Sequence, residues 1–537
     1  MARLIKLKHL ILVLIVALGV WALLPPKESE GHKSVRLGTD PRHLQNLAAG
    51  TMVLRVHAGA YLPGLMPDNV GSPLQGLTKV AAAFEKLYPD TRLEFVGVPA
   101  KMREWLVTQL SSGQAPDIVC VNVEDVWQDV QKKWYIPLNR FLDAPNPFVA
   151  KPNAGSQKWW DIFKYPVPTR GTCAPDGNFY CITLDMIETG IFYNKNIFRN
   201  LGLHEPKDWP DFLEIQKKIK AAGYTPTLVD KGAFTDWGVD LAFYQVYSEI
   251  SDLLDLRYDP TSGDYLKGYL DWDELVFLHS KGFFSPKDAR WRETFRILKQ
   301  WRQYMQKSLG DTEDMMRAFL TQRGAMFWST SMSVNRFSRD KDIDFDWGIF
   351  YLPPIPKYFS RFASGRDQCV IGGSGMQYEV TNSSIKDTDP AVPFEQRMQQ
   401  SKRLQRVIQF LQFLTTPKNA DTVVNEMTQF LPNVKGASFK QELAPFDQFL
   451  QRHYSMTKWD FTFDNQFHET FLRMFELYLN NGLTEDEYLD WMQRNLDAAC
   501  EKLISRKNVN LKPLQQEWDK RRERLRVVKE LPEGALN

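Results

Sequence analysis

The spacing of hydrophobic positions after residue 50 switches repeatedly between a strand pattern and a helix pattern. Residues 52–58 (MVLRVHA) and 92–98 (RLEFVGV) have the pattern of strands. Between them, apolar residues recur three and four positions apart, which predicts one buried face of a helix. The members of that face are Leu74, Leu77, Val80, Phe84 and Leu87. The pattern thus predicts a strand, a helix and a second strand in this order.

A second helix and a third strand follow in the same way. The apolar face of the helix is formed by Met102, Trp105, Leu106 and Leu110. Residues 117–121 (DIVCV) are a short, nearly all-apolar run, as expected of a parallel strand that is buried on both faces. Strands that alternate with helices are typical of a doubly wound α/β fold.

The chain is long and nearly neutral. Its 537 residues exceed what one compact core usually holds, so two or more lobes are expected. Lys and Arg number 67 and Asp and Glu number 65, which leaves a formal net charge of +2. That balance produces no global field that would attract nucleic acid or an anionic membrane. We therefore expect no nucleic-acid partner.

An apolar run near the N-terminus has the pattern of a targeting segment. Basic residues precede apolar residues 10–24, a run shorter than the about 20 residues of a membrane span. Residues 1–24 are thus interpreted as a signal peptide or a signal anchor, and residues 25–50, which lack periodicity, as a linker. An uncleaved run would anchor the protein to the inner membrane. In both cases the protein is exported to the periplasm or the cell surface.

Five cysteines are spread along the chain, and two of them flank a turn. Cys173 and Cys181 lie on either side of Asp176-Gly177 and could be neighbours across two strands. In an exported protein they form a candidate disulfide. The alternative is that all the cysteines stay unlinked, since an odd number leaves at least one over. No Cys-x-x-Cys pair exists, so a metal or redox motif has no support.

Motifs of catalysis are missing or incomplete. The chain has neither a G-x-x-x-x-GK[ST] phosphate loop nor a G-x-G-x-x-G nucleotide fingerprint. Its eight His show no HExxH spacing, which argues against a zinc hydrolase. Residues 372–376 (GGSGM) resemble a nucleophile elbow, but Met376 stands where the last Gly is required. The sequence therefore predicts no catalytic residue, no cofactor and no metal.

Residues 176–202 (DGNFYCITLDMIETGIFYNKNIFRNLG) are the most informative stretch of the chain. A turn leads to a short strand, a polar turn and an apolar strand, after which a helix begins at once. This stretch resembles the hinge-crossing segment of type-1 extracellular solute-binding proteins, the sugar- and oligosaccharide-binding subunits of ATP-driven importers. The residues that carry the resemblance are Gly177, Tyr180, Ile182, Asp185, Phe192, Tyr193, Asn194, Lys195 and Phe198.

Further motifs follow the family's order from about residue 51 to residue 440. Each is weak alone, but as an ordered set they are specific. They are residues 113–122 (GQAPDIVCVN), 134–142 (WYIPLNRFL), 209–212 (WPDF), 319–328 (FLTQRGAMFW), 345–354 (FDWGIFYLPP) and 404–420 (LQRVIQFLQFLTTPKNA), with Leu431-Pro432 after them.

The resemblance implies an α/β fold of the periplasmic-binding-protein type, with two lobes that close like a Venus flytrap. Strands that cross between the lobes make each lobe discontinuous in sequence. We expect residues 51–183 with 372–435 in the N-terminal lobe, and residues 184–371 with 436–537 in the C-terminal lobe. The end of the chain departs from the family as a helical C-terminal extension. Its charged tail, from residue 513, is interpreted as a solvated helix.

The resemblance also places a ligand site in the cleft between the lobes. Asn122 and Glu124 follow the strand at residues 117–121, in the loop that contacts sugar hydroxyls in this family. The alternative is that Asp125 or Asn122 caps the next helix. Asp185 lies in the hinge-crossing turn, where it is either a ligand-facing acid or a turn aspartate. Tyr61 follows the first strand, where the family's first loop faces the cleft.

Later segments supply the other expected contacts. Trp237 lies where the family often places an aromatic ring that stacks on a sugar, with Asp236 beside it; the alternative is a core tryptophan. Ser331 and Met332 follow a strand, and this chain lacks the Trp that the family often has near Met332. Gly373 lies in a Gly-rich second hinge crossing, where a backbone amide can approach the ligand.

These features favour an extracytoplasmic subunit that binds a carbohydrate and delivers it to the membrane permease subunits of an ABC importer, and we expect it to be a monomer. A membrane-tethered subunit that reports ligand to a signalling partner would use the same lobes, and an uncleaved anchor would favour it. A secreted carbohydrate-active enzyme would need a pair of cleft carboxylates that the sequence does not show.

Overall fold

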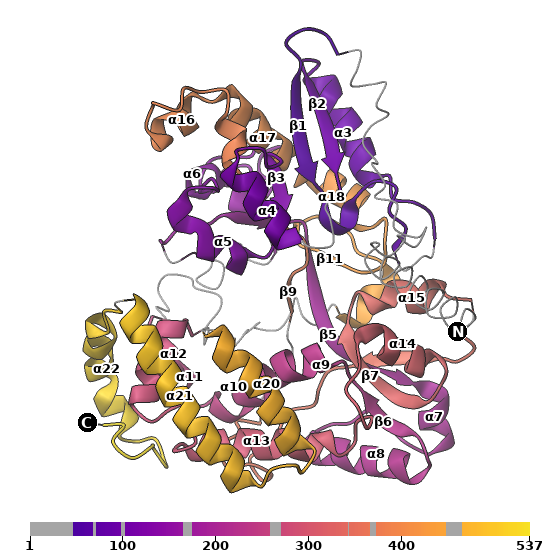
Figure 1. Ribbon diagram of the computed structural model, residues 1–537. Coiled ribbons are helices and arrows are strands. Elements are labelled where there is room, and N and C mark those ends of the chain that lie inside the picture. The colour runs from indigo at the N-terminus through magenta and orange to yellow at the C-terminus, as the bar shows by residue number, and fades with distance from the viewer. Residues whose placement is uncertain are drawn as a thin grey trace, which may run out of the picture.

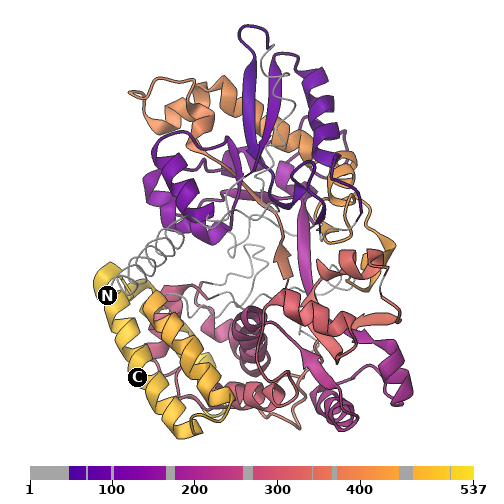
Figure 2. The same cartoon turned by 45° about the vertical axis from the view of Figure 1, so that its right-hand side comes forward.

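The computed structural model describes residues 47–67, 71–97, 102–164, 174, 176–257, 270–341, 343–365, 372–446, 464–507 and 509–536, except for the side chains of Glu124, Gln128, Asn465 and Lys507. Within these ranges the chain forms an upper and a lower lobe joined by the long strand β5 (Figures 1 and 2). The expected two-lobed α/β fold is therefore confirmed. The upper lobe holds the N-terminal part of the described chain, and the lower lobe holds its C-terminal helices.

The sheet of the N-terminal lobe is mixed, and two of its strands come from later in the chain. Its strands, in order across the sheet, are β2 (Thr91–Val96), β1 (Met52–His57), β3 (Ile118–Cys120), β10 (Gln377–Val380) and β4 (Cys181–Thr183). β1 runs parallel to β2 and β3, whereas β10 is antiparallel to β3 and β4. The three predicted early strands are thus present and neighbouring.

Helices cover this sheet and bury the faces that the spacing predicted. In α3 (Gly76–Leu87), Leu77, Val80 and Phe84 are buried, but Leu87 is 55% exposed, because the helix ends there beyond the edge of the core. The remaining helical segments of this lobe are η2 (Gly59–Tyr61), α4 (Met102–Ser111), α5 (Val123–Asp129), η4 (Val130–Lys132), α6 (Asn139–Leu142), η5 (Trp159–Ile162), η8 (Asn382–Ile385), α16 (Phe394–Gln400), α17 (Lys402–Leu414) and α18 (Pro417–Val424).

The sheet of the C-terminal lobe is organised around β5 (Asp185–Asn194). Its path is β11 (Leu431–Pro432), β5, β7 (Gly324–Thr330) and β6 (Thr225–Leu228), with β8 (Trp347–Phe350) and β9 (Gly372–Ser374) also paired with β5. The first residues of β5 pair with β11 and β9, and its last residues pair with β7 and β8. The chain therefore passes from one sheet to the other between Thr183 and Asp185, and back between Ser374 and Gln377.

Helices pack on both sides of this second sheet (Figure 1). They begin at clear N-caps: Asn194 accepts hydrogen bonds from the backbone of Asn196 and Ile197, and Asp208 accepts one from Asp211. The helical segments are α7 (Lys195–Asn200), α8 (Trp209–Ala221), α9 (Lys231–Ala233), η7 (Phe234–Gly238), α10 (Val239–Tyr247), α11 (Ser251–Leu254), α12 (Trp272–Ser280), α13 (Ala289–Arg302), α14 (Thr312–Leu320), α15 (Ser333–Arg339) and η9 (Gln441–Phe446).

The C-terminal extension is part of the core of the C-terminal lobe. It consists of α20 (Asn465–Leu479), α21 (Glu485–Lys507) and α22 (Lys512–Leu525). Phe475 of α20 stacks on Phe234, with ring centroids 6.1 Å apart. The expectation of a solvated tail is wrong in part, because α22 buries Leu514, Trp518, Arg521 and Leu525 while most of its other charged residues are exposed.

No helix in the described ranges is both long and apolar enough to cross a membrane. The run at residues 10–24 lies outside those ranges. Its expected role as a signal peptide or an anchor therefore stays a prediction.

Candidate functional site

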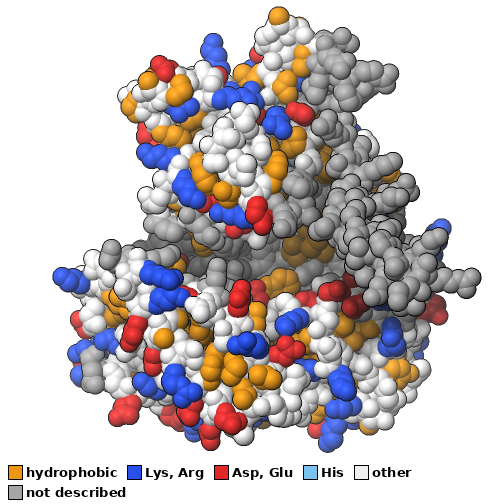
Figure 3. All heavy atoms as spheres, in the orientation of Figure 1, with side chains coloured by type: hydrophobic (Ala, Val, Ile, Leu, Met, Phe, Trp, Pro, Cys, Tyr) orange, Lys and Arg blue, Asp and Glu red, His pale blue; other side chains and the backbone are white. Residues whose placement is uncertain are grey.

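A hollow separates the two lobes on the face shown in Figure 3. Figure 1, in the same orientation, shows α4 and α5 in the upper lobe and α10, α12 and α20 in the lower lobe, with β5 running between the lobes. The ends of strands from both sheets meet near this crossing, which is where open α/β lobes usually bind ligands.

Asp185 and Tyr61 meet beneath this region, at the start of β5. Asp185 is 0% exposed and Tyr61 is 2% exposed. The Tyr61 hydroxyl donates to one carboxylate oxygen of Asp185, and the backbone N–H of Met376 donates to the other at 2.8 Å. The structure thus brings the two predicted residues together, but it uses both carboxylate oxygens inside the protein. Because Asp185 is fully buried, a direct contact with ligand would require the residues that cover it to move.

Burial changes the acidity of Asp185. It raises the pKa of the carboxyl to about 7 from its ordinary 3.8, against the opposing effect of the hydrogen bonds from Tyr61 and the backbone. The folded protein therefore holds a proton on Asp185 at pH values where the unfolded chain has lost it. It follows that this group makes folding less favourable as pH rises from about 4 to about 7.

Replacing Asp185 with asparagine should flatten the pH dependence of stability. The wild-type free energy of unfolding should fall by about 2–3 kcal/mol more than that of the variant between about pH 5 and about pH 8, because only the wild type must ionise a buried acid. Urea unfolding at both pH values measures the difference. Asp143→Asn, at an exposed position, serves as the control. Parallel curves for the wild type and Asp185→Asn would contradict the expectation.

Two sulfur atoms lie beside this acid. The thiol of Cys120 is 3.7 Å from the sulfur of Met376, and that sulfur also accepts the backbone N–H of Ala60 at 3.3 Å. Gly59 makes room for the pair: it has φ +58°, and a Cβ there would lie 2.8 Å from Cys120 Sγ. Sequence reasoning assigned Met376 no role in the site. The sequence signal that could have identified Met376 is its position in the Gly-rich hinge crossing. This position lets its backbone N–H donate to the Asp185 carboxylate.

Asn122 stands at the N-cap of α5 but does not cap it. Its side chain makes no capping bond and is exposed. The side-chain oxygen of Gln377 instead accepts the N–H of Val123 at 2.9 Å. The alternative of a capping asparagine is therefore wrong, and a contact of the exposed amide with ligand stays a prediction. The side chain of Glu124 lies outside the described part.

Asp236 and Trp237 lie in η7, a short π-helix. A π-turn adds a residue to the helical turn and is often found at functional sites. Phe234 fixes this turn from beneath, since it is fully buried and its ring centroid lies 5.6 Å from that of Trp301. Asp236 remains exposed, and Trp237 is half-buried against the core of the lobe. Trp237 is thus only partly covered by the protein.

The remaining predicted contacts lie within the hinge. Ser331 is fully buried; its hydroxyl donates to the carbonyl of Gln429 at 2.8 Å, so it joins hinge segments and does not line a surface. Met332 is half-buried and packs against the N-terminal lobe's core. Gly373 pairs with Ile187 in the crossing strands. Whether these three residues touch ligand stays a prediction.

The candidate disulfide is not tested by the structure. Cys181 is buried in β4. Its expected partner, Cys173, lies outside the described residues.

The chain was compared with known proteins. The family described as "Bacterial extracellular solute-binding protein" matches residues 69–421. A multiple sugar-binding protein of Streptococcus mutans is 26% identical over 154 residues, which cover 28% of this chain and 32% of that protein. A sn-glycerol-3-phosphate-binding periplasmic protein of Brucella abortus is 40% identical over 55 residues, 10% of this chain and 13% of the relative. The chain thus matches about a third or less of the length of these curated relatives.

Solved structures share the fold over most of the chain. RafE in complex with raffinose has a TM-score of 0.54 at 14% identity, and the match covers 84% of this chain and 100% of RafE. A chitin oligosaccharide binding protein has a TM-score of 0.56 at 17% identity, with coverage of 84% and 100%. Because the family match spans well over half of the residues, and the two-lobed fold agrees with it, this chain belongs to the bacterial extracellular solute-binding protein family.

Proposed function

We propose that the chain is the extracytoplasmic solute-binding subunit of an ABC importer, which binds a sugar or oligosaccharide between its lobes and delivers it to the permease subunits. One observation supports the proposal: exposed Asn122, at the N-cap of α5, and Asp236 with Trp237, in η7, belong to opposite lobes. Similar proteins that are named for sugar, raffinose or chitin oligosaccharide binding support a carbohydrate as the ligand.

The chemistry of these side chains suits a neutral sugar. The exposed part of the Trp237 indole can stack on the C–H face of a sugar ring, and the Asn122 amide and Asp236 carboxylate can bind its hydroxyls. A ligand held from both sides favours the closed lobes, because only that state lets both lobes touch it. Tyr61, Asp185 and the Met376 backbone would then hold the crossing in place below the ligand.

The cellular setting is also part of the proposal. The protein would act as a monomer in the periplasm or at the cell surface, with residues 1–24 as a signal peptide or a membrane anchor and residues 25–50 as a linker. The lobes would rotate about a hinge near residues 184 and 375, where the chain crosses between them. Because of these crossings, each lobe would consist of separate stretches of chain.

Trp237→Ala should weaken sugar binding by about 1–3 kcal/mol, because it removes an apolar stacking plane. Calorimetric titration with raffinose and chito-oligosaccharides, or with another mono- or oligosaccharide that binds, measures the change. Trp160→Ala, another half-buried tryptophan but in η5 of the N-terminal lobe, is the matched control and should keep wild-type affinity. Equal affinities for the wild type and Trp237→Ala would remove the stacking role.

A further inference from the structure

A second hollow lies on the N-terminal lobe and is built from that lobe alone. It has a volume of about 400 Å³, within the range of small-molecule sites. The end of α4, the turn after η4, η8 and the segment that leads into α16 form it. Its lining includes Lys133, Ser383, Lys386, Val392, Phe394 and Arg397. We call it the basic groove, since three of these residues are cations and none is an acid.

The cations of the basic groove have no carboxylate partner within the described part of the chain. The Arg397 guanidinium donates to two neutral acceptors, the Thr388 hydroxyl at 3.0 Å and the Ile385 carbonyl at 3.2 Å. The Lys133 ammonium lies 5.9 Å from the centroid of the Phe394 ring. The two hydrogen bonds hold the Arg397 guanidinium in place without neutralising it. The groove therefore presents three cations that form no direct ion pair among the described residues.

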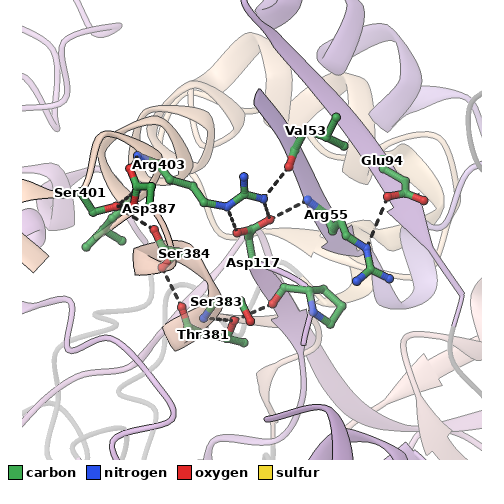
Figure 4. Close-up of polar contacts among 12 residues, drawn as sticks. Val53, Arg55, Glu94, Asp117, Thr381, Ser383, Ser384, Asp387, Ser401 and Arg403 are labelled. Carbon is green, nitrogen blue, oxygen red and sulfur yellow. Dashed lines mark hydrogen bonds and ion pairs between the residues drawn. The ribbon is translucent and has the colours of Figure 1, made fainter. Parts of the chain in front are cut away.

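A buried network of ion pairs and hydrogen bonds lies next to the groove. Arg403 holds Asp117 by two bonds of 2.6 Å, and the backbone N–H of Arg55 also donates to that carboxylate (Figure 4). Ser383, which lines the groove, belongs to the same set of polar contacts. Burial, together with the charges of Arg403 and Arg55, lowers the pKa of Lys386 despite Asp117. The charged form of Lys386 is thus disfavoured at this position.

We propose that the basic groove binds a small organic polyanion, a di- or tricarboxylate or a phosphate ester. Lys133, Lys386 and Arg397 would supply charge-assisted hydrogen bonds to its anionic groups. Val392 and Phe394 would contact its carbon skeleton. Because every lining residue belongs to one lobe, this site is separate from the hollow between the lobes and does not depend on the ligand bound there.

Calorimetric titrations of the full chain with citrate, inorganic phosphate and glycerol 3-phosphate, at low ionic strength, test the proposal. At least one of these probes should bind. Tighter binding of citrate would indicate a carboxylate ligand, and tighter binding of either phosphate would indicate a phosphate ligand. The double variant Lys133→Gln/Lys386→Gln should weaken binding about tenfold or more, since two charge-assisted contacts are lost.

The matched control is Lys79→Gln/Lys418→Gln, which removes the same charge from exposed positions of the same lobe and should change affinity less than about twofold. Failure of all three probes to bind would overturn the proposal. An equal loss of anion affinity in both double variants would also overturn it. Such a result would show that anions respond only to the overall charge of the lobe. Binding of a polyglutamate peptide without any binding of the small anions would replace it with a protein partner.

Discussion

Replacing Arg403 with methionine should lower the free energy of unfolding by about 3–5 kcal/mol, because it leaves the Asp117 carboxylate buried without its cation. The Asp117 side chain is 1% exposed and that of Arg403 is 9% exposed. Both guanidinium contacts with the carboxylate measure 2.6 Å, and they tie α17 to the central strands β1 and β3 (Figure 4). Methionine keeps the apolar stem but cannot neutralise the acid.

Urea unfolding followed by circular dichroism measures this loss. The control uses the same substitution on the same helix: Arg406→Met breaks a pair with Asp90, whose side chain is 63% exposed, and should cost about 1 kcal/mol or less. The double variant Arg403→Met/Asp117→Leu should recover part of the loss, because it removes the unpaired charge as well. Equal losses in the two single variants would contradict the importance of burial.

Trp328→Ala should also destabilise the protein by about 3–5 kcal/mol, through the cavity that it leaves. Trp328 lies in the middle of β7, is 1% exposed and packs 5.4 Å from Trp301, measured between ring centroids. Thermal or urea unfolding shows the effect. The matched comparison is Trp237→Ala, which removes an indole that is only half-buried and should lose less stability but more sugar affinity. The reverse ranking would mean that the two tryptophans have exchanged roles.

Much of the fold could be predicted from local patterns, because spacing decides which face of an element is buried. The early strands and α3 agree with the periodicity of their apolar residues. Leu87 was expected to be buried but is exposed, because periodicity does not show where the core ends. The prediction of a solvated C-terminal helix was wrong for a related reason. The many Lys and Arg residues of this segment dominate its composition, although Leu514 and Trp518 form a narrow buried face. The hinge-crossing motif located β5, since its turn and helix start have strong local signals.

The candidate site was harder to predict because its contacts join distant parts of the chain. Tyr61 and Asp185 were each identified as residues of the cleft, but no local pattern shows that one donates to the other. Asn122 had the residue type of a helix cap, yet Gln377 from the second crossing satisfies the helix start instead. Whether a polar side chain stays exposed depends on whether another residue takes its expected hydrogen bond. A single sequence does not reveal which residue does so.

A thermal-shift screen of the purified protein tests the central claim most directly, with neutral mono- and oligosaccharides set against amino acids, peptides and metal ions. A ligand that binds only the folded state stabilises it by about 2.7 kcal/mol at a concentration about 100 times its Kd. We expect at least one sugar to raise the melting temperature. No shift with any sugar, together with a clear shift from an amino acid, a peptide or a metal ion, would contradict the account.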